Sequence, residues 1–148
     1  MNKVLLWLDD IRDPFSDNIW LQQYVPEFLN SGEVIWVKSY IDFEMWIYYN
    51  GLPSHISFDH DLADEHYCPQ HKWNDYDDWV KNHNFNEKTG MDCAKFVVDY
   101  CLDYRKRLPI CTVHSANPVG AQNIKSLLTN FTKHQEKFFE EDDTIFKK

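Results

Sequence analysis

The sequence predicts a single α/β domain, residues 1–148, in which helices cover an open and mainly parallel sheet. Short runs of consecutive apolar residues, such as VLLWL at residues 4–8, are typical of strands that are buried on both faces. These runs alternate along the chain with segments of helical apolar spacing, which is the order that builds parallel sheets. The length of 148 residues suits one domain with one core.

The first part of the chain contains three predicted strands. They are residues 4–8, 34–40 and 55–61. Prolines and a glycine exclude a long helix after the first strand, so only a short helix around residues 20–24 is expected there. Ser39 and Asp42 form a capping-box pattern that opens a helix over residues 40–50, and Gly51 ends this helix.

Residues 62–88 form a polar and aromatic insertion after the third strand. A segment of this length without periodicity is usually functional or disordered, and its aromatic content argues against disorder. Its aromatic residues either pack on the domain as a lid or stack on the bases of a ligand. They are Tyr67, Trp73, Tyr76, Trp79 and Phe85. A zinc site is the weaker alternative, because the spacing of its potential ligands matches no strong zinc pattern. These ligands are His66, Cys68, His71 and His83.

A second capping-box pattern, at Thr89 and Asp92, opens a helix that we expect to end near Arg107. Residues 110–114 then form the fourth predicted strand. The final helix starts with Asn117 as its cap and a proline at its first position. At the end of the chain, the apolar residues of TIF at 144–146 would form a short edge strand, which brings the predicted sheet to four or five strands.

Acidic residues outnumber basic residues by 24 to 15, which gives a net charge of −9. Because duplex DNA is bound mainly through Lys and Arg contacts to phosphates, a duplex DNA partner is not expected. A small anionic ligand is compatible with this charge if a metal ion or a helix N-terminus supplies local positive potential. No apolar run approaches the ~20 residues that span a bilayer, and the N-terminus does not resemble a signal peptide. We therefore expect a cytoplasmic protein without a membrane partner, in the host cytoplasm if it is phage-encoded.

Polar side chains follow three of the predicted strands, and the carboxyl ends of parallel strands meet at one edge of a sheet. The candidate metal ligands there are Asp9, Asp10, Asp59 and Asp61. Several carboxylates this close together stay ionised only if a cation neutralises them. Oxygen ligands favour Mg²⁺ or Mn²⁺, whereas a contribution from His60 or His114 would shift the preference towards Mn²⁺ or Zn²⁺.

The segment HSANPVGAQN at residues 114–123 adds a phosphate-binding pattern to this edge. Its small residues allow a ligand to approach the backbone, and the N–H groups of a helix start attract anions. The start of the preceding helix offers a second set of N–H donors. Arg12 either clamps a phosphate or forms an ion pair with the neighbouring acids. The candidate phosphate-binding residues are Arg12, Thr89, Gly90, Ser115, Asn117 and Gly120.

Four blocks in order, LWLDDIRDP, ISFDHDL, TGMDCAKFVVDY and VHSANPVG, resemble the cyclic-phosphate-processing receiver-like family. The resemblance covers residues 4–130 apart from the insertion. It implies a receiver-like, flavodoxin-like three-layer fold in which the acidic pocket is retained. It also implies a role in handling cyclic phosphates of nucleotides or RNA ends.

Two functions are consistent with this reading. In the first, the protein is a metal-dependent phosphodiesterase for cyclic phosphates or cyclic nucleotides, with His114, His60 and Asp59 as the catalytic residues. In the second, it sequesters a cyclic nucleotide without cleaving it. Either function could counter a nucleotide-signalled antiviral defence. A phosphorelay receiver is less well supported, because such a domain needs a lysine at the end of a fifth strand. Here the final helix is followed only by a short tail, with Lys147 and Lys148 at its end.

Overall fold

The computed structural model describes residues 3–16, 19–62 and 88–146. The predicted lid residues and the potential zinc ligands of the insertion lie outside these ranges. The strands are β1 (Val4–Leu8), β2 (Glu33–Val37), β3 (His55–Phe58) and β4 (Ile110–Val113). The helices are α1 (Ile19–Tyr24), the 3₁₀ helix η1 (Pro26–Phe28), α2 (Tyr40–Asn50), α4 (Gly90–Tyr104) and α5 (Pro118–Phe146).

The four strands pair in the order β2-β1-β3-β4, and every pair is parallel. This confirms the predicted parallel α/β fold. The register places the last residues of all four strands side by side, because Leu8 pairs with Val37 and with Phe58, and Phe58 pairs with Val113. The residues that follow these strand ends are therefore brought to one edge of the sheet.

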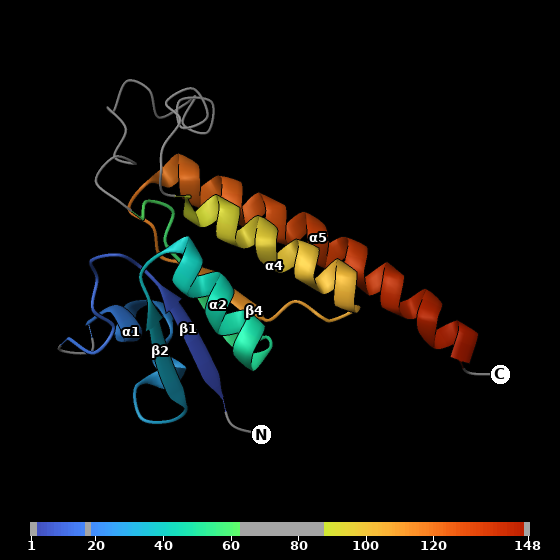
Figure 1. The fold of residues 1–148 in the computed structure, drawn as a ribbon, viewed down its shortest axis with the longest axis horizontal. Helices are drawn as coiled ribbons and strands as arrows, with labels where there is room; N and C mark the ends of the chain where they lie inside the picture. Colours follow the sequence, from blue (N-terminus) through green and yellow to red (C-terminus); the bar gives the residue numbers. More distant parts are fainter. Residues whose placement is uncertain (1–2, 17–18, 63–87, 147–148) are drawn as a thin grey trace.

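Helices cover both faces of the sheet and form a three-layer arrangement (Figure 1). On one face, Leu6, Ile56 and Phe58 pack against residues of α2, α4 and α5. On the other face, Leu5 and Trp7 pack against α1 and η1. Successive side chains of β1 are thus buried on opposite faces, which is why its sequence is continuously apolar.

The helix boundaries confirm the capping patterns. Ser39 Oγ accepts a hydrogen bond from the N–H of Asp42 at 3.1 Å, and α2 ends at Gly51, which has a φ of +79°. Thr89 and Asp92 form the predicted reciprocal capping box at the start of α4. Because the cap residues of α2 and α4 need extended backbone outside the helix, they separate each helix from the preceding segment.

Several predicted boundaries were wrong. α4 ends at Tyr104 rather than near Arg107, because Arg105 adopts a left-handed conformation with a φ of 54° that stops the helix. β2 and β3 end at Val37 and Phe58, three residues earlier than predicted.

Residues 144–146 belong to α5 and not to an edge strand. No glycine or proline follows Gly120 in the sequence, so nothing in the chain interrupts this helix. α5 is 29 residues long, lies beside α4 and continues past its end (Figure 1). Among the helices in the described ranges, none combines the length and the apolarity that a membrane span requires.

Candidate metal and phosphate site

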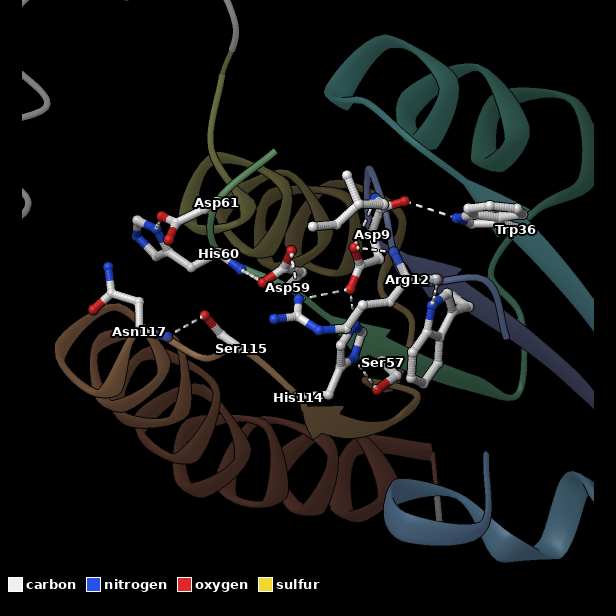
Figure 2. Close-up of polar contacts among 12 residues, drawn as sticks. Asp9, Arg12, Trp36, Ser57, Asp59, His60, Asp61, His114, Ser115 and Asn117 are labelled. Carbon is white, nitrogen blue, oxygen red and sulfur yellow. Dashed lines mark hydrogen bonds and ion pairs between the residues drawn. The ribbon is translucent and has the colours of Figure 1, made fainter. Parts of the chain in front are cut away.

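The site lies at the carboxyl ends of β1, β3 and β4 (Figure 2). The first residue after each of these strands still forms a sheet hydrogen bond. Asp9 N donates to Val37 O at 3.1 Å, Asp59 N donates to Leu8 O at 3.0 Å, and His114 N donates to Phe58 O at 2.9 Å. These bonds fix the backbone of the site residues to the sheet, so the side chains lie on a rigid platform.

Asp9, Asp10 and Asp59 each place a carboxylate oxygen within 4.8 Å of the others. Asp9 is fully buried and Asp59 is 2% exposed. The Oδ2 atom of Asp59 is buried and has no hydrogen-bond partner. A buried carboxylate oxygen without a hydrogen-bond partner is costly, and the Nη1 atom of Arg12 at 3.6 Å is too distant to supply one. A divalent cation held by the three carboxylates would satisfy this oxygen. The donor set therefore fits the predicted ion.

Arg12 forms an ion pair with the acids, which is one of its two predicted roles. Its Nη1 atom lies 3.1 Å from Asp9 Oδ2 and 3.6 Å from Asp59 Oδ2. The turn after β1 places Arg12 there, because the N–H groups of Ile11 and Arg12 both donate to Asp9 Oδ1. The guanidinium group also lies over the ring of Trp20, 5.4 Å from its centre.

His114 lies beneath Asp9 and contacts two side chains with its two ring nitrogens (Figure 2). Nε2 is 3.0 Å from Asp9 Oδ2, and Nδ1 is 2.7 Å from Ser57 Oγ. The imidazole stacks on Trp7 with ring centres 3.8 Å apart. Burial lowers the pKa of His114, and the hydrogen bond and charge of Asp9 offset only part of this effect. A neutral ring with Nε2–H donating to Asp9 and Nδ1 accepting from Ser57 satisfies all three groups.

The carboxylates of Asp9 and Asp59 have opposite pKa shifts. Burial alone would raise the pKa of Asp9, but hydrogen bonds from His114 and from the backbone of Arg12 and Ile11 hold it below 3.8. Burial and the charge of Asp9 raise the pKa of Asp59 to about 8, although Arg12 partly opposes this. Without further positive charge, Asp59 is therefore largely protonated at neutral pH. A divalent cation bound beside Asp59 would lower its pKa again and keep the carboxylate ionised.

His60 and Asp61 lie on the far side of Asp59 from Asp9 (Figure 2). Asp61 is outside the group of three carboxylates, and its Oδ1 atom lies 3.1 Å from His60 Nδ1. His60 is fully buried. The predicted role of Asp61 as a metal ligand and the predicted catalytic role of His60 stay predictions.

The glycines of the two helix starts make close contacts with the loop after β3. Gly90 N donates to His60 O at 2.8 Å, and Gly120 N donates to the cap oxygen of Asn117 at 3.0 Å. A Cβ atom at Gly90 would lie 1.7 Å from Asp59 O, and one at Gly120 would lie 2.5 Å from the His60 ring. Both glycines thus allow the helix starts to approach the site, and both N–H groups donate within the protein.

The remaining predicted phosphate-binding residues lie at the two helix starts: Thr89 and Asn117 cap α4 and α5, and Ser115 precedes the cap of α5. Thr89 is buried, and its N–H and hydroxyl both contact Asp92 Oδ2. Ser115 Oγ accepts a hydrogen bond from Asn117 N at 3.1 Å, and Ser115 is partly exposed. Their predicted contacts with a phosphate stay predictions.

Three residues of the site were not anticipated from the sequence. Trp36 Nε1 donates to Asp9 O at 2.7 Å, and Trp7 Nε1 donates to Arg12 O at 3.0 Å, so two indoles hold the acidic turn. Ser57 binds His114 from within β3. A polar residue inside the otherwise apolar segment ISF was the one available signal for Ser57.

Comparisons with known proteins give one match. The family of cyclic-phosphate processing receiver domains matches residues 4–130, which include all the site residues described above. No curated protein and no solved structure matches the chain. Since the match covers most of the 148 residues, the chain belongs to the family of cyclic-phosphate processing receiver domains.

Proposed function

We propose that this protein is a metal-dependent phosphodiesterase that hydrolyses a cyclic phosphate, either in a nucleotide or at an RNA end. The observation that carries the proposal is the group of Asp9, Asp10 and Asp59, in which the buried Oδ2 atom of Asp59 lacks a hydrogen-bond partner. The family match supports cyclic phosphate as the substrate class.

The three carboxylates would hold Mg²⁺ or Mn²⁺. Both ring nitrogens of His114 already have partners in Asp9 and Ser57, so the donors that remain in this group are oxygens. An all-oxygen set favours these ions over Zn²⁺. Such an ion supplies positive charge for the phosphoryl oxygens and acidifies a bound water.

Arg12 would bind the substrate phosphate. The Arg12 side chain is 17% exposed and forms ion pairs with Asp9 and Asp59. When these carboxylates hold a cation, their attraction for Arg12 would be weaker. Its guanidinium would then be available for two parallel hydrogen bonds to a phosphate. The protein otherwise carries a net charge of −9, so this local cation matters for attracting an anionic substrate.

His114 is better suited to positioning Asp9 than to proton transfer. A proton transfer from His114 would break its bond to Asp9 or to Ser57, and the ring is only 2% exposed. The pair of His60 and Asp61 is the other candidate for general acid–base chemistry. Its nitrogen–oxygen distance is 3.1 Å, and because His60 is itself fully buried, Asp61 at 7% exposure is the group of the pair that would exchange a proton with substrate or water.

The test is a turnover assay with purified protein, Mg²⁺ or Mn²⁺, and a panel of cyclic phosphates. The panel contains 2′,3′-cyclic and 3′,5′-cyclic mononucleotides, cyclic dinucleotides and an RNA with a 2′,3′-cyclic phosphate end. We expect turnover of at least one compound, and a loss of ~100-fold or more in Asp59→Asn. The matched control is Asp103→Asn, which changes an exposed acid on α4. Absence of turnover across the panel with both metals would reject the catalytic proposal.

A second candidate is a protein that binds a cyclic nucleotide without cleaving it. The observation that favours it is the burial of both histidines near the site, with His60 at 0% and His114 at 2% exposure. Intact ligand recovered after binding and heat denaturation would support sequestration, whereas recovery of a linear product would exclude it. Either activity would lower the level of a cytoplasmic nucleotide signal and so counter an antiviral defence that depends on it.

A further inference from the structure

A concave feature lies along the outer edge of β4, away from the acidic site. It is a groove of about 790 Å³ between β4 and the middle of α5. One wall consists of residues 108–113, and the other consists of α5 side chains that recur at helical spacing, including Lys125, Thr129 and Lys133. None of the residues that line it belongs to the candidate metal and phosphate site.

The β4 side of this groove is an open sheet edge within the described part of the chain. Ile110 N donates to Ser54 O and His114 N donates to Phe58 O, so the even-numbered residues of this segment face β3. Because hydrogen-bonding direction alternates along a strand, the N–H and C=O groups of Cys111 and Val113 face the groove. No strand in the described ranges pairs with β4 on that side. Such an edge is a template for another extended segment.

The groove also has a definite charge. Lys125 and Lys133 are the charged residues that line it, both are exposed, and no acidic residue lines it. This local positive charge contrasts with the net charge of −9 for the whole chain. Apolar surface accompanies it, since Ile110 is 64% exposed at the start of the strand. An extended segment with alternating apolar and acidic residues complements both properties.

We propose that this groove binds an extended, acidic peptide segment of a partner protein, which adds a strand to the sheet along β4. A second copy of this chain is a poorer occupant, because pairing of two β4 edges would bring the lysines of both copies together. The binding is independent of the phosphodiesterase activity proposed above.

The test uses a seven-residue synthetic peptide that alternates valine and glutamate, and a counterpart with lysine in place of glutamate. Both are titrated into the full-length protein and followed by NMR. We expect the glutamate peptide to bind at least ~10-fold more tightly, because the groove carries two lysines. It should shift the amide signals of Cys111 and Val113 and slow their hydrogen exchange. A glutamate peptide that is N-methylated at every residue should not bind, since it has no N–H group left on either edge to form a ladder.

Charge-swapped variants complete the test. Lys125→Glu with Lys133→Glu should reverse the preference between the two peptides, whereas Lys95→Glu with Lys106→Glu, at exposed positions outside the groove, should leave it unchanged. The proposal is overturned if the glutamate peptide does not bind or if the N-methylated peptide binds equally well. It is also overturned if Cys111 and Val113 are already protected from exchange without peptide, either in the monomer or in a dimer detected by sedimentation.

Discussion

Asp59 is the residue whose ionisation depends most strongly on its surroundings. It lies beside the ionised Asp9 and the guanidinium of Arg12, and burial at 2% exposure removes most of the solvent that would stabilise its charge. A buried acid with a raised pKa and a partner acid nearby is a common feature of functional sites. The ionisation state of Asp59 therefore depends on the positive charge placed beside it, either Arg12 alone or Arg12 with a bound metal ion.

The raised pKa of Asp59 makes the stability of the metal-free protein depend on pH. Its folded-state pKa of about 8 lies above the ordinary value of 3.8, so the folded state binds this proton more tightly than the unfolded state. The resulting stabilisation is complete below about pH 3.8 and is lost as pH rises towards 8. We expect Asp59→Asn to flatten this decline and to stabilise the metal-free protein at pH 8 by several kcal/mol. The upper bound is ~5 kcal/mol, because the two pKa values differ by about 4 and each unit corresponds to ~1.4 kcal/mol.

Urea unfolding at several pH values between 5 and 9, with a chelator present, measures this effect. Asp103→Asn serves as the control, because it removes an exposed carboxyl. An unchanged pH profile in Asp59→Asn would show that another group controls the decline.

Trp36 positions Asp9 through a hydrogen bond to its backbone carbonyl at 2.7 Å. We expect Trp36→Phe to keep the ring packing but to loosen the acidic turn, which should weaken Mn²⁺ affinity by ~10-fold. Trp46→Phe is the matched control, since Trp46 on α2 is also half-buried against the core but lies outside the site. Isothermal titration with Mn²⁺ measures both affinities, and equal affinities in the two variants would contradict the positioning role.

At the scale of elements, the starts of α4 and α5 are pressed against the loop after β3. The two contacts differ in severity, because a Cβ atom at Gly90 would meet backbone whereas one at Gly120 would meet the His60 side chain. Backbone of the sheet platform cannot move without breaking the bond from Asp59 N to Leu8 O, whereas a side chain has more freedom. The start of α4 therefore tolerates a larger residue at Gly90 less well than the start of α5 tolerates one at Gly120.

Alanine substitutions at the two glycines test this packing. Helix propensity alone would make alanine stabilising relative to glycine by up to ~1 kcal/mol. We expect the opposite sign, with Gly120→Ala destabilising by ~1–3 kcal/mol and Gly90→Ala by more, because the clash outweighs the propensity. Chemical denaturation gives both values. Stabilisation by either alanine would show that the approach of the helices is looser than described.

At the scale of the whole molecule, the site joins loops from both ends of the chain. Asp9 and His114 are 105 residues apart in sequence and lie 3.0 Å apart at the site. Unfolding separates the three carboxylates, so a cation that they hold stabilises the folded state as a whole.

Thermal unfolding should therefore depend on divalent metal. We expect saturating Mn²⁺ or Mg²⁺ to raise the Tm by ~5–10 °C, since binding at ~100 times the Kd contributes ~2.7 kcal/mol. Ca²⁺ should be less effective if the site is too small for its larger ligand set. The shift should be reduced strongly in Asp10→Asn and retained in Asp103→Asn. An equal shift in both variants would place the bound metal elsewhere on the protein.

The sequence by itself determined the order and type of the four described strands and of the four described α-helices, and it identified the strand ends that carry the acids. It did not predict η1, and it wrongly placed an edge strand at residues 144–146, which belong to α5. Apolar runs such as VLLWL and caps such as Ser39 and Asn117 are local signals, so they can be read without knowledge of the fold. The parallel register follows from the α/β order and brings the carboxyl ends together. The end of α4 at Arg105 was missed, because a left-handed residue other than glycine leaves no clear signal in the sequence.

Only the tertiary structure decided the partners of the site residues. Trp7, Trp36 and Ser57 contact the acidic turn or His114 from strands that are distant in sequence, and no local pattern specifies such contacts. The structure also separates Asp61 from the group of three carboxylates, because β3 ends at Phe58 and the chain turns before Asp61. Local propensities determined the elements, whereas burial and long-range packing determined which charged groups face one another.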